Sequence, residues 1–133
     1  MRYLLDTHTF LWTVAGSKRL SLRARKEIED PDNEILVSSV SFWEVAMKNR
    51  RGKLDLGGLR PIDLIERAKD MEILLIGLDP EEAATHGKLL EDTHFDPFDR
   101  MLIWQAISRK IVLISSDTKF KRFRRDGLKL LWN

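Results

Sequence analysis

The sequence predicts an α/β fold built around a central parallel sheet of about five strands, with helices packed against it. Five short apolar runs have the length and near-continuous apolar character of buried parallel strands. Segments with apolar residues at helical spacing lie between them, and strands that alternate with helices favour parallel pairing. The glycine-rich stretch 52–61 fits an internal loop better than a domain boundary, so we expect residues 1–133 to form one domain.

The expected elements follow from these apolar patterns in chain order. The strands are expected at 3–5, 35–37, 73–76, 111–114 and, more weakly, 129–132. Three helices are expected around apolar residues at helical spacing, namely Leu22, Ala24 and Ile28; Phe42, Val45 and Ala46; and Ile62, Ile65 and Ala68, with Pro61 near the first turn of the last. The clearest helix covers 97–109, because its apolar residues share one face: Leu102, Ile103, Ala106 and Ile107.

Composition excludes several classes of protein. With 43% hydrophobic residues the chain can fill a core, yet no stretch is apolar for long enough to cross a membrane. The apolar start at 3–5 meets a charge at Asp6, which is too early for a signal-peptide core. The absence of cysteine excludes disulfides and thiolate metal sites, and we expect a cytoplasmic protein.

The charge is unevenly distributed, although the net charge is only +2. Residues 119–129 contain six basic residues and one acid, and residues 48–55 contain four basic residues and one acid. Such patches can neutralise phosphates and attract a polyanion. A solvated helix face is the alternative interpretation of the same charge runs.

Four acids are expected near the carboxyl edge of the sheet, where ligands bind in open α/β folds. Asp6, Glu44 and Asp117 follow the first, second and fourth strands, and Asp99 lies in the first turn of the helix before the fourth. If the first and fourth strands are neighbours, Asp6 and Asp117 emerge side by side. Clustered carboxylates suit a hard divalent cation such as Mg²⁺ or Mn²⁺, which can activate water against a phosphodiester.

Each acid also has a purely structural interpretation as a helix cap. Ser41 and Glu44 have the spacing of a capping box, and Asp96 precedes Pro97 as an N-cap precedes the first helical residue. The acids after the first and fourth strands would cap the helices that follow them equally well. Residues 79–82, after the third strand, repeat the pattern and need no chemistry. Only the acids taken together favour a catalytic site.

Four motifs carry a resemblance to a known family. They are Asp6-Thr7-His8, Phe42-Trp43-Glu44, His94-Phe95-Asp96-Pro97-Phe98-Asp99-Arg100 and Ser116-Asp117-Thr118-Lys119-Phe120. In this order and spacing they resemble the successive motifs of PIN-domain proteins, above all the VapC-type toxins of bacterial and archaeal toxin–antitoxin pairs. The resemblance covers nearly the whole chain, and the motif that ends in Asp-Pro-Phe-Asp-Arg is its most specific part.

The resemblance implies both a fold and an activity. The fold would be a three-layer α/β/α sandwich around the parallel sheet, and the activity a Mg²⁺- or Mn²⁺-dependent endoribonuclease. Asp6, Glu44 and Asp99 would be the core metal ligands, with Asp117 as the fourth acid through water. The resemblance further implies a homodimer and a cognate antitoxin whose tail, with a cationic side chain, covers the acidic cleft.

Neighbouring polar residues are candidates for supporting roles. Arg100, Lys48 and Lys119 are candidate phosphate ligands for the RNA substrate. Three hydroxyl residues beside the acids suit hydrogen bonds to them: Thr7, Ser39 and Ser116. Two histidines are candidates for phosphate contact, proton transfer or metal binding, although each also fits a structural role: His8 and His94.

Two other function classes stand beside the ribonuclease hypothesis. Haloacid-dehalogenase-like phosphatases also place an aspartate after the first strand, but they need a second one two residues later, where this chain has His8. A non-catalytic RNA-binding or scaffold module would keep the fold and use its acids only as caps. Nucleotide-binding folds are disfavoured, because the chain has neither a Gly-x-x-x-x-Gly-Lys loop nor a Gly-x-Gly-x-x-Gly fingerprint.

Overall fold

The computed structural model describes residues 1–133 and contains one five-stranded sheet in which all neighbouring strands are parallel. The strands are β1 (Arg2–Leu5), β2 (Glu34–Ser38), β3 (Leu74–Ile76), β4 (Val112–Ile114) and β5 (Leu130–Leu131). Each lies within about two residues of its expected position. The strand order is β3-β2-β1-β4-β5, so the first and fourth strands are central neighbours.

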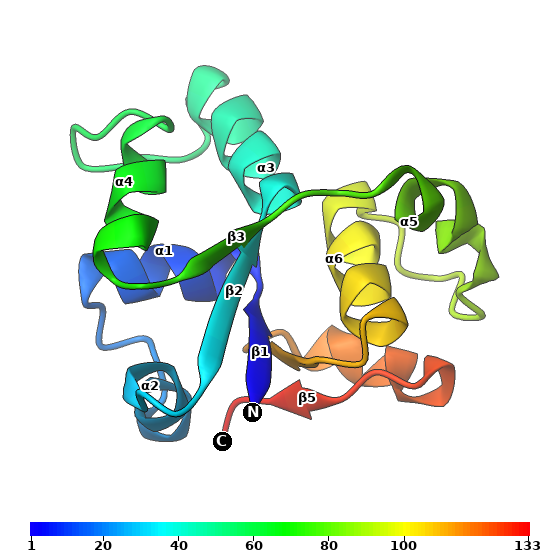
Figure 1. Cartoon of the computed structure of the whole chain (residues 1–133). Helices are drawn as coiled ribbons and strands as arrows, with labels where there is room; N and C mark the ends of the chain where they lie inside the picture. The colour runs from blue at the N-terminus through cyan, green and yellow to red at the C-terminus, as the bar shows by residue number, and fades with distance from the viewer.

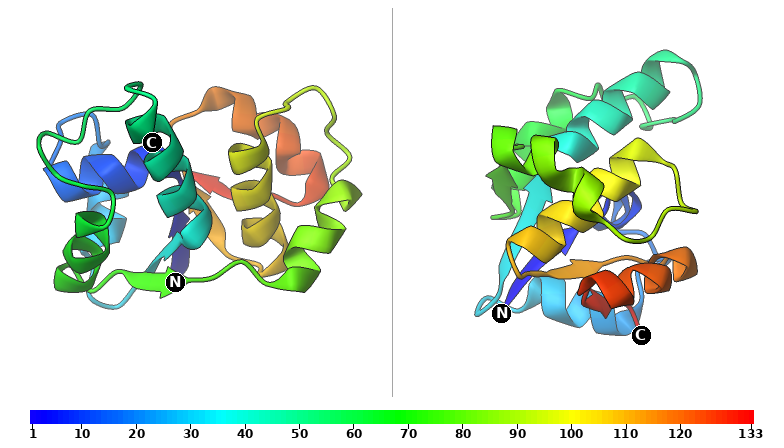
Figure 2. Two further views of the ribbon diagram at one scale, coloured as in Figure 1. Left: turned by 90° about the horizontal axis from the view of Figure 1, so that it is seen from above. Right: turned by 90° about the vertical axis from the view of Figure 1, so that its right-hand side faces the viewer.

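Helices cover both faces of this sheet (Figures 1 and 2). They are α1 (Thr7–Ala15), α2 (Leu22–Glu29), α3 (Ser39–Arg50), α4 (Asp63–Asp70), α5 (Pro80–Thr85), α6 (Pro97–Ser108) and the 3₁₀ helices η1 (His86–Lys88) and η2 (Thr118–Asp126). Figure 1 shows α1, α2 and α4 on one side of the sheet and α5 and α6 on the other. The three-layer α/β/α architecture is thus confirmed, and none of its helices is long and apolar enough to span a membrane.

Alternate residues of the central strands point into two separate cores. Tyr3 and Leu5 belong to the core beneath α1, α2 and α4, whereas Leu4 between them packs into the opposite core with Ile103 and Phe120. Strand residues buried on both faces need no polar alternation, which explains why these runs are continuously apolar. Each fully buried Leu or Phe contributes about 1.5–3 kcal/mol, so the two cores hold the helices firmly on the sheet.

Two of the expected helices leave their first apolar residue outside the core. Leu22 is 85% exposed and Ile62 is 59% exposed, whereas Ala24 and Ala68 of the same apolar patterns are buried. The helix α4 starts one residue after Ile62, so its core face is formed by Leu64 and Ala68. A residue at the very end of a helix projects beyond the core that the helix covers, and spacing alone does not reveal this.

The third strand also differs from the expectation. The sequence predicts a strand buried on both faces, but Leu74 and Leu75 are 47% and 41% exposed. The cause is the strand order, because β3 lies at the edge of the sheet and pairs only with β2. An apolar run does not distinguish an edge strand from a central one.

Candidate active site

The four predicted acids lie on segments that start at the carboxyl edge of the sheet. Asp6 directly follows β1 and is the N-cap residue of α1, and Asp117 is the N-cap residue of η2 after β4. Glu44 lies within α3, which follows β2 without a loop, and Asp99 lies in the first turn of α6. The helices α3 and α6 pack against each other, as Figure 2 shows, so they bring Glu44 and Asp99 toward the same edge.

Asp6 is a buried carboxylate, only 7% exposed. Its Oδ1 accepts a hydrogen bond of 2.9 Å from the backbone N–H of Thr9, so the cap interpretation is correct as far as it goes. Burial raises the pKa of Asp6, and hydrogen bonds from Ser115 and Thr9 oppose that rise. Helix caps are ordinarily solvated, so capping accounts for one oxygen of this carboxylate but not for its burial.

Glu44 is 3% exposed, and both of its carboxylate oxygens have tertiary or side-chain partners. Thr7 Oγ1 donates to Oε1 at 2.6 Å, and Lys48 forms an ion pair with Oε2. The capping-box interpretation is wrong, because α3 starts directly at the end of β2 with Ser38 as its N-cap. Ser41 therefore lies inside the helix, and Glu44 is free of any capping role.

Asp99 belongs to the same charged group as Glu44. Its Oδ2 accepts a 2.9 Å hydrogen bond from His94 Nε2. Burial is the main cause that raises the pKa of Asp99 to about 6, and the charges of Asp96 and Glu44 raise it further. The hydrogen bond from His94 acts in the opposite direction and lowers this pKa. Two acids from separate helices thus repel each other across a partly buried space, as the metal-site hypothesis requires. We call Glu44, Asp96 and Asp99 the carboxylate cluster.

Lys48 provides a positive charge within this cluster. Burial lowers the pKa of Lys48, but the hydrogen bond to Glu44 and the charges of Glu44, Asp96 and Asp99 outweigh this effect and raise it. The ammonium group therefore stays protonated and neutralises part of the negative charge. The sequence predicts that Lys48 binds phosphate, and in the structure its side chain forms an ion pair with Glu44.

Asp96 and Asp117 act as helix caps. Asp96 Oδ1 accepts from the N–H of Asp99 at 2.9 Å, as predicted from its place before a proline. Asp117 Oδ1 accepts from the N–H of Lys119 at 2.9 Å, and Asp117 also lines a separate pocket. Glu44 and Asp99 thus lie close enough for their charges to interact, and Thr7 links Glu44 to the segment of Asp6, while Asp117 has no direct contact with these three acids.

One of the three predicted hydroxyl groups contacts an acid. Thr7 donates to Glu44 as expected, but Ser39 and Ser116 are exposed. The serine before each of them is buried, because successive residues at a strand end face opposite sides. Ser38 donates to the Gln105 side chain at 2.6 Å, and Ser115 accepts from the N–H of Asp117 at 3.1 Å.

Arg100 and His94 organise the loop that precedes α6. The Arg100 guanidinium donates to the backbone oxygens of Glu91 and His94 at 2.7 and 3.0 Å. The His94 ring packs edge-on against Phe120 and Phe123, with centroid distances of 5.6 and 5.8 Å. The position of His94 against Asp99 is therefore fixed from two sides, while Arg100 is occupied with the loop.

The carboxylates match a hard divalent cation in chemistry and charge. As the side chains stand, no three His, Asp or Glu residues are grouped closely enough to hold an ion together. Thr7 and Lys48 already occupy both oxygens of Glu44, and His94 occupies one oxygen of Asp99. Oxygen ligands and mutual repulsion are the conditions that Mg²⁺ or Mn²⁺ relieves. The residue types therefore suit such an ion, which would have to replace the Lys48 ammonium at Glu44.

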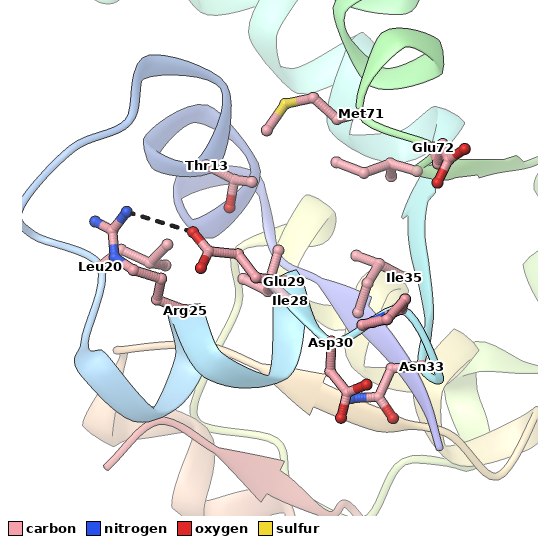
Figure 3. Close-up of a pocket in the computed structure, with 12 residues that line it drawn as sticks. Thr13, Leu20, Arg25, Ile28, Glu29, Asp30, Asn33, Ile35, Met71 and Glu72 are labelled. Atoms are coloured by element: carbon pink, nitrogen blue, oxygen red, sulfur yellow. Dashed lines mark ion pairs between the residues drawn. The ribbon is translucent and has the colours of Figure 1, made fainter.

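A pocket at the opposite edge of the sheet contains none of these acids. Figure 3 shows it near the amino ends of β2 and β3, with Ile35 and Glu72 among its lining residues. Its charged residues include Arg25 and Glu29, which pair with each other at 3.8 Å. The candidate chemistry lies at the carboxyl edge, and we assign this pocket no part in it.

The comparison with known families agrees with the geometry. The PIN domain family model matches residues 3–126, which is nearly the whole chain. The chain belongs to the PIN domain family. The family prediction made from the sequence motifs is thereby confirmed, together with the fold that it implied.

Relatives of this PIN domain carry VapC and VapBC names. The chain is 27% identical to "Ribonuclease VapC22" of Mycobacterium tuberculosis over 129 residues, which are 97% of each chain. A solved structure of VapBC2 from Rickettsia felis bound to a promoter DNA fragment matches with a TM-score of 0.71 at 17% identity, over 100% of both chains. Mycobacterium tuberculosis VapC20, described as a Sarcin-Ricin loop cleaving toxin, matches with a TM-score of 0.63 at 14% identity, over 98% and 99%. At these identities the structural matches establish the PIN fold.

Proposed function

We propose that this PIN domain is a divalent-metal-dependent endoribonuclease that hydrolyses phosphodiester bonds in single-stranded or loop RNA, and the toxin of a type II toxin–antitoxin pair. One observation carries the proposal: the buried carboxylate of Glu44 accepts a 2.6 Å hydrogen bond from Thr7, the residue after the buried Asp6, and its charge acts on Asp99 of a different helix. The family membership and the ribonuclease relative support the same activity. Residues 1–133 form the nuclease domain in this proposal.

In this proposal Asp6, Glu44 and Asp99 hold Mg²⁺ or Mn²⁺, and Asp117 contributes through water. A divalent ion held by these residues would supply Lewis-acid activation of water and stabilisation of the leaving oxygen. The chain itself orients the ligands. Thr7 fixes the Glu44 carboxylate by its hydrogen bond to Oε1, and His94 fixes the Asp99 carboxylate and limits the rise of its pKa.

The proposed substrate contacts come from lysines beside the acids. Lys48 faces the carboxylate cluster, so its ammonium is available to a phosphate once an ion has taken its place at Glu44. Lys119 is exposed at the start of η2, next to Asp117. Arg100 serves the substrate indirectly, by holding the loop that carries His94. Exposed nucleotides are the expected target, because their backbone bends into a cleft more easily than a duplex does.

The proposed partners are RNA, a cognate antitoxin and a second copy of the chain. Exposed apolar side chains flank the carboxylate cluster in the sequence: Trp43 at 58%, Met47 at 37% and Phe95 at 79% exposure. An exposed apolar surface around a functional site is typical of a protein interface. An antitoxin segment bound there would bring a cationic side chain to the acids. Because the proposed substrate is cellular RNA, we also propose that the enzyme acts in the cytoplasm.

Matched carboxamide variants test the proposal. Purified protein is incubated with RNA and Mg²⁺, with and without EDTA, and cleavage products are mapped by their 5′ ends. We expect EDTA-sensitive cleavage that Asp6→Asn and Glu44→Gln each reduce at least about 100-fold, the order expected when a group central to catalysis is removed. Asp79→Asn is the control, because Asp79 caps α5 as Asp6 caps α1 but lies outside the site. Full activity of Asp6→Asn, or equal loss in Asp79→Asn, would refute the assignment.

A further inference from the structure

The 3₁₀ helix η2 divides its side chains among three faces. A 3₁₀ helix has three residues per turn, so residues three apart in sequence lie above one another. Phe120 and Phe123 form the first face and are completely buried in the core. Each of the other two faces carries basic residues, so the basic run in the sequence is not one patch.

One basic face of η2 fastens the loop before α6. Arg122 donates to Thr93 Oγ1 at 3.2 Å, and Arg125 donates to the backbone oxygen of Leu90 at 2.9 Å. Arg125 also lies 3.9 Å from the carboxylate of Glu91. These arginines are occupied with the protein itself.

The other basic face of η2 lines a pocket. Thr118, Lys121 and Arg124 follow one another at intervals of three residues, and all three line a cavity of about 320 Å³. Arg23 of α2 and Trp132, just after β5, also line this cavity. The volume falls within the usual range of about 300–1,000 Å³ for small-molecule sites.

Two cationic side chains of this pocket are not used by the protein for ion pairs. Lys121 and Arg124 form none, whereas Arg23 donates to the main-chain oxygen of Asn133, the last residue of the sequence, at 2.9 Å. Asp117 is the carboxylate among the lining residues, and its Oδ1 accepts from a backbone N–H. Two cations without an ion pair, Lys121 and Arg124, beside one carboxylate that caps a helix favour an anionic ligand.

The pocket adjoins the acids through Ser115. This serine lines the pocket and accepts a 3.1 Å hydrogen bond from the N–H of Asp117. It directly follows Ile114 of β4, whose backbone oxygen accepts a 3.2 Å hydrogen bond from the N–H of Asp6, so the pocket begins one residue beyond the segment that pairs with Asp6. A polyanion bound at the acids would have to extend by only a short distance to enter it.

We propose that the pocket of Arg23, Lys121 and Arg124 binds a backbone phosphate of the RNA chain next to the phosphodiester that is cut. The inference rests on the proposed nuclease function and adds a second anchoring point for its substrate. Hydroxyl groups of Ser116 and Thr118 at the rim suit the same phosphate. Trp132 supplies an aromatic wall against which an adjacent base can stack.

Binding of RNA without cleavage tests the proposal. Affinity for a single-stranded RNA of roughly 12 nucleotides, a length in the range that single-strand binding sites cover, is measured by fluorescence anisotropy in EDTA at several salt concentrations. We expect Lys121→Ala/Arg124→Ala to weaken binding about tenfold and to lower the slope of log K against log salt by about 1.4, the value for two phosphate contacts to a single strand. The charge-conserving Lys121→Arg/Arg124→Lys should bind like wild type.

The matched control is Lys18→Ala/Lys129→Ala, which removes the same charge from exposed residues outside the pocket. It should change affinity less than about threefold, as expected for long-range screening alone. Equal RNA binding by the pocket variant and wild type, with unchanged thermal unfolding, would overturn the proposal, even if an acidic protein proved to bind there. If the wild-type protein binds RNA but never cleaves it, the nuclease function is refuted. The comparison of RNA affinities would then still show whether the pocket binds an RNA phosphate.

Discussion

Lys48 and Glu44 form an ion pair across one turn of α3, and the charges of Asp96 and Asp99 act on the same ammonium group. The chain therefore carries its own counter-ion at the position where the proposed metal ligands meet. A divalent ion has to compete with this ammonium for Glu44. Removing the Lys48 side chain therefore tests most clearly whether Glu44 only pairs with an internal cation or also binds a metal ion.

Replacing Lys48 with methionine should tighten metal binding and destabilise the metal-free protein. The buried Glu44 carboxylate loses its partner, which costs about 1–3 kcal/mol, and the crowded carboxylates then attract Mn²⁺ more strongly. We expect a Mn²⁺ dissociation constant several-fold lower by titration calorimetry, and a larger rise in unfolding temperature on adding Mn²⁺ than in wild type. Lys48→Arg is the control that keeps the charge. Weaker Mn²⁺ binding in Lys48→Met would contradict the competition.

Protonated Asp99 is predicted to stabilise the metal-free protein at low pH. Its pKa is raised to about 6 in the folded chain, above its ordinary value of 3.8. Because the folded chain holds this proton more tightly than the unfolded chain, the contribution of Asp99 to the free energy of unfolding is fully present below pH 3.8 and is lost as the pH rises through about 6. We expect Asp99→Asn to stabilise the metal-free protein by about 1–3 kcal/mol near neutral pH, with the gain disappearing near pH 4. A gain that does not depend on pH would contradict this cause.

His94 is predicted to set the pH at which the site accepts metal. Its hydrogen bond lowers the pKa of Asp99, so His94→Phe, which keeps an aromatic ring against Phe120 and Phe123, should raise that pKa further. The midpoint of Mn²⁺ binding against pH should move upward, with affinity recovered at alkaline pH. His86→Gln, on the exposed η1, should leave the midpoint unchanged. A uniform loss of affinity at every pH would indicate a merely structural role.

Asp6 is predicted to combine a cap with a catalytic charge, and two variants separate them. Asparagine caps a helix about as well as aspartate, whereas alanine costs about 1 kcal/mol. Asp6→Asn should therefore retain the cap of α1 and still lose RNA cleavage, while Asp6→Ala should lose both. At Asp79, alanine should cost similar stability in urea unfolding and leave cleavage intact. Cleavage that follows stability rather than charge would contradict the double role.

The strands were predictable because their environment is simple. β1 and β4 are buried on both faces, and continuous apolar runs are the direct consequence. The exposure of Leu75 in β3 and of Leu22 in α2 was not predictable, because it depends on strand order and on how far a helix extends past the core. These are tertiary properties that local periodicity does not encode.

The candidate site was predictable in its acids and much less in their surroundings. The places of Asp6 and Glu44 follow from where parallel strands end, and that of Asp99 from the first turn of the helix before β4. The exposure of Ser39 and Ser116 was not predictable, because the chain alternates sides at a strand end and the sequence does not show which side is buried. The basic run after Asp117 was predicted as one patch. The 3₁₀ period of η2 divides it into a loop anchor and a pocket wall, and composition carries no trace of that period.

A crystal structure with Mn²⁺, phased for anomalous scattering, tests the central claim most directly. The account predicts an anomalous peak among Asp6, Glu44 and Asp99, at the short metal–oxygen distances of about 2.0–2.2 Å typical of such ions, with Lys48 turned away from Glu44. A peak only elsewhere on the surface, with the ion pair of Lys48 and Glu44 intact at saturating Mn²⁺, would contradict it.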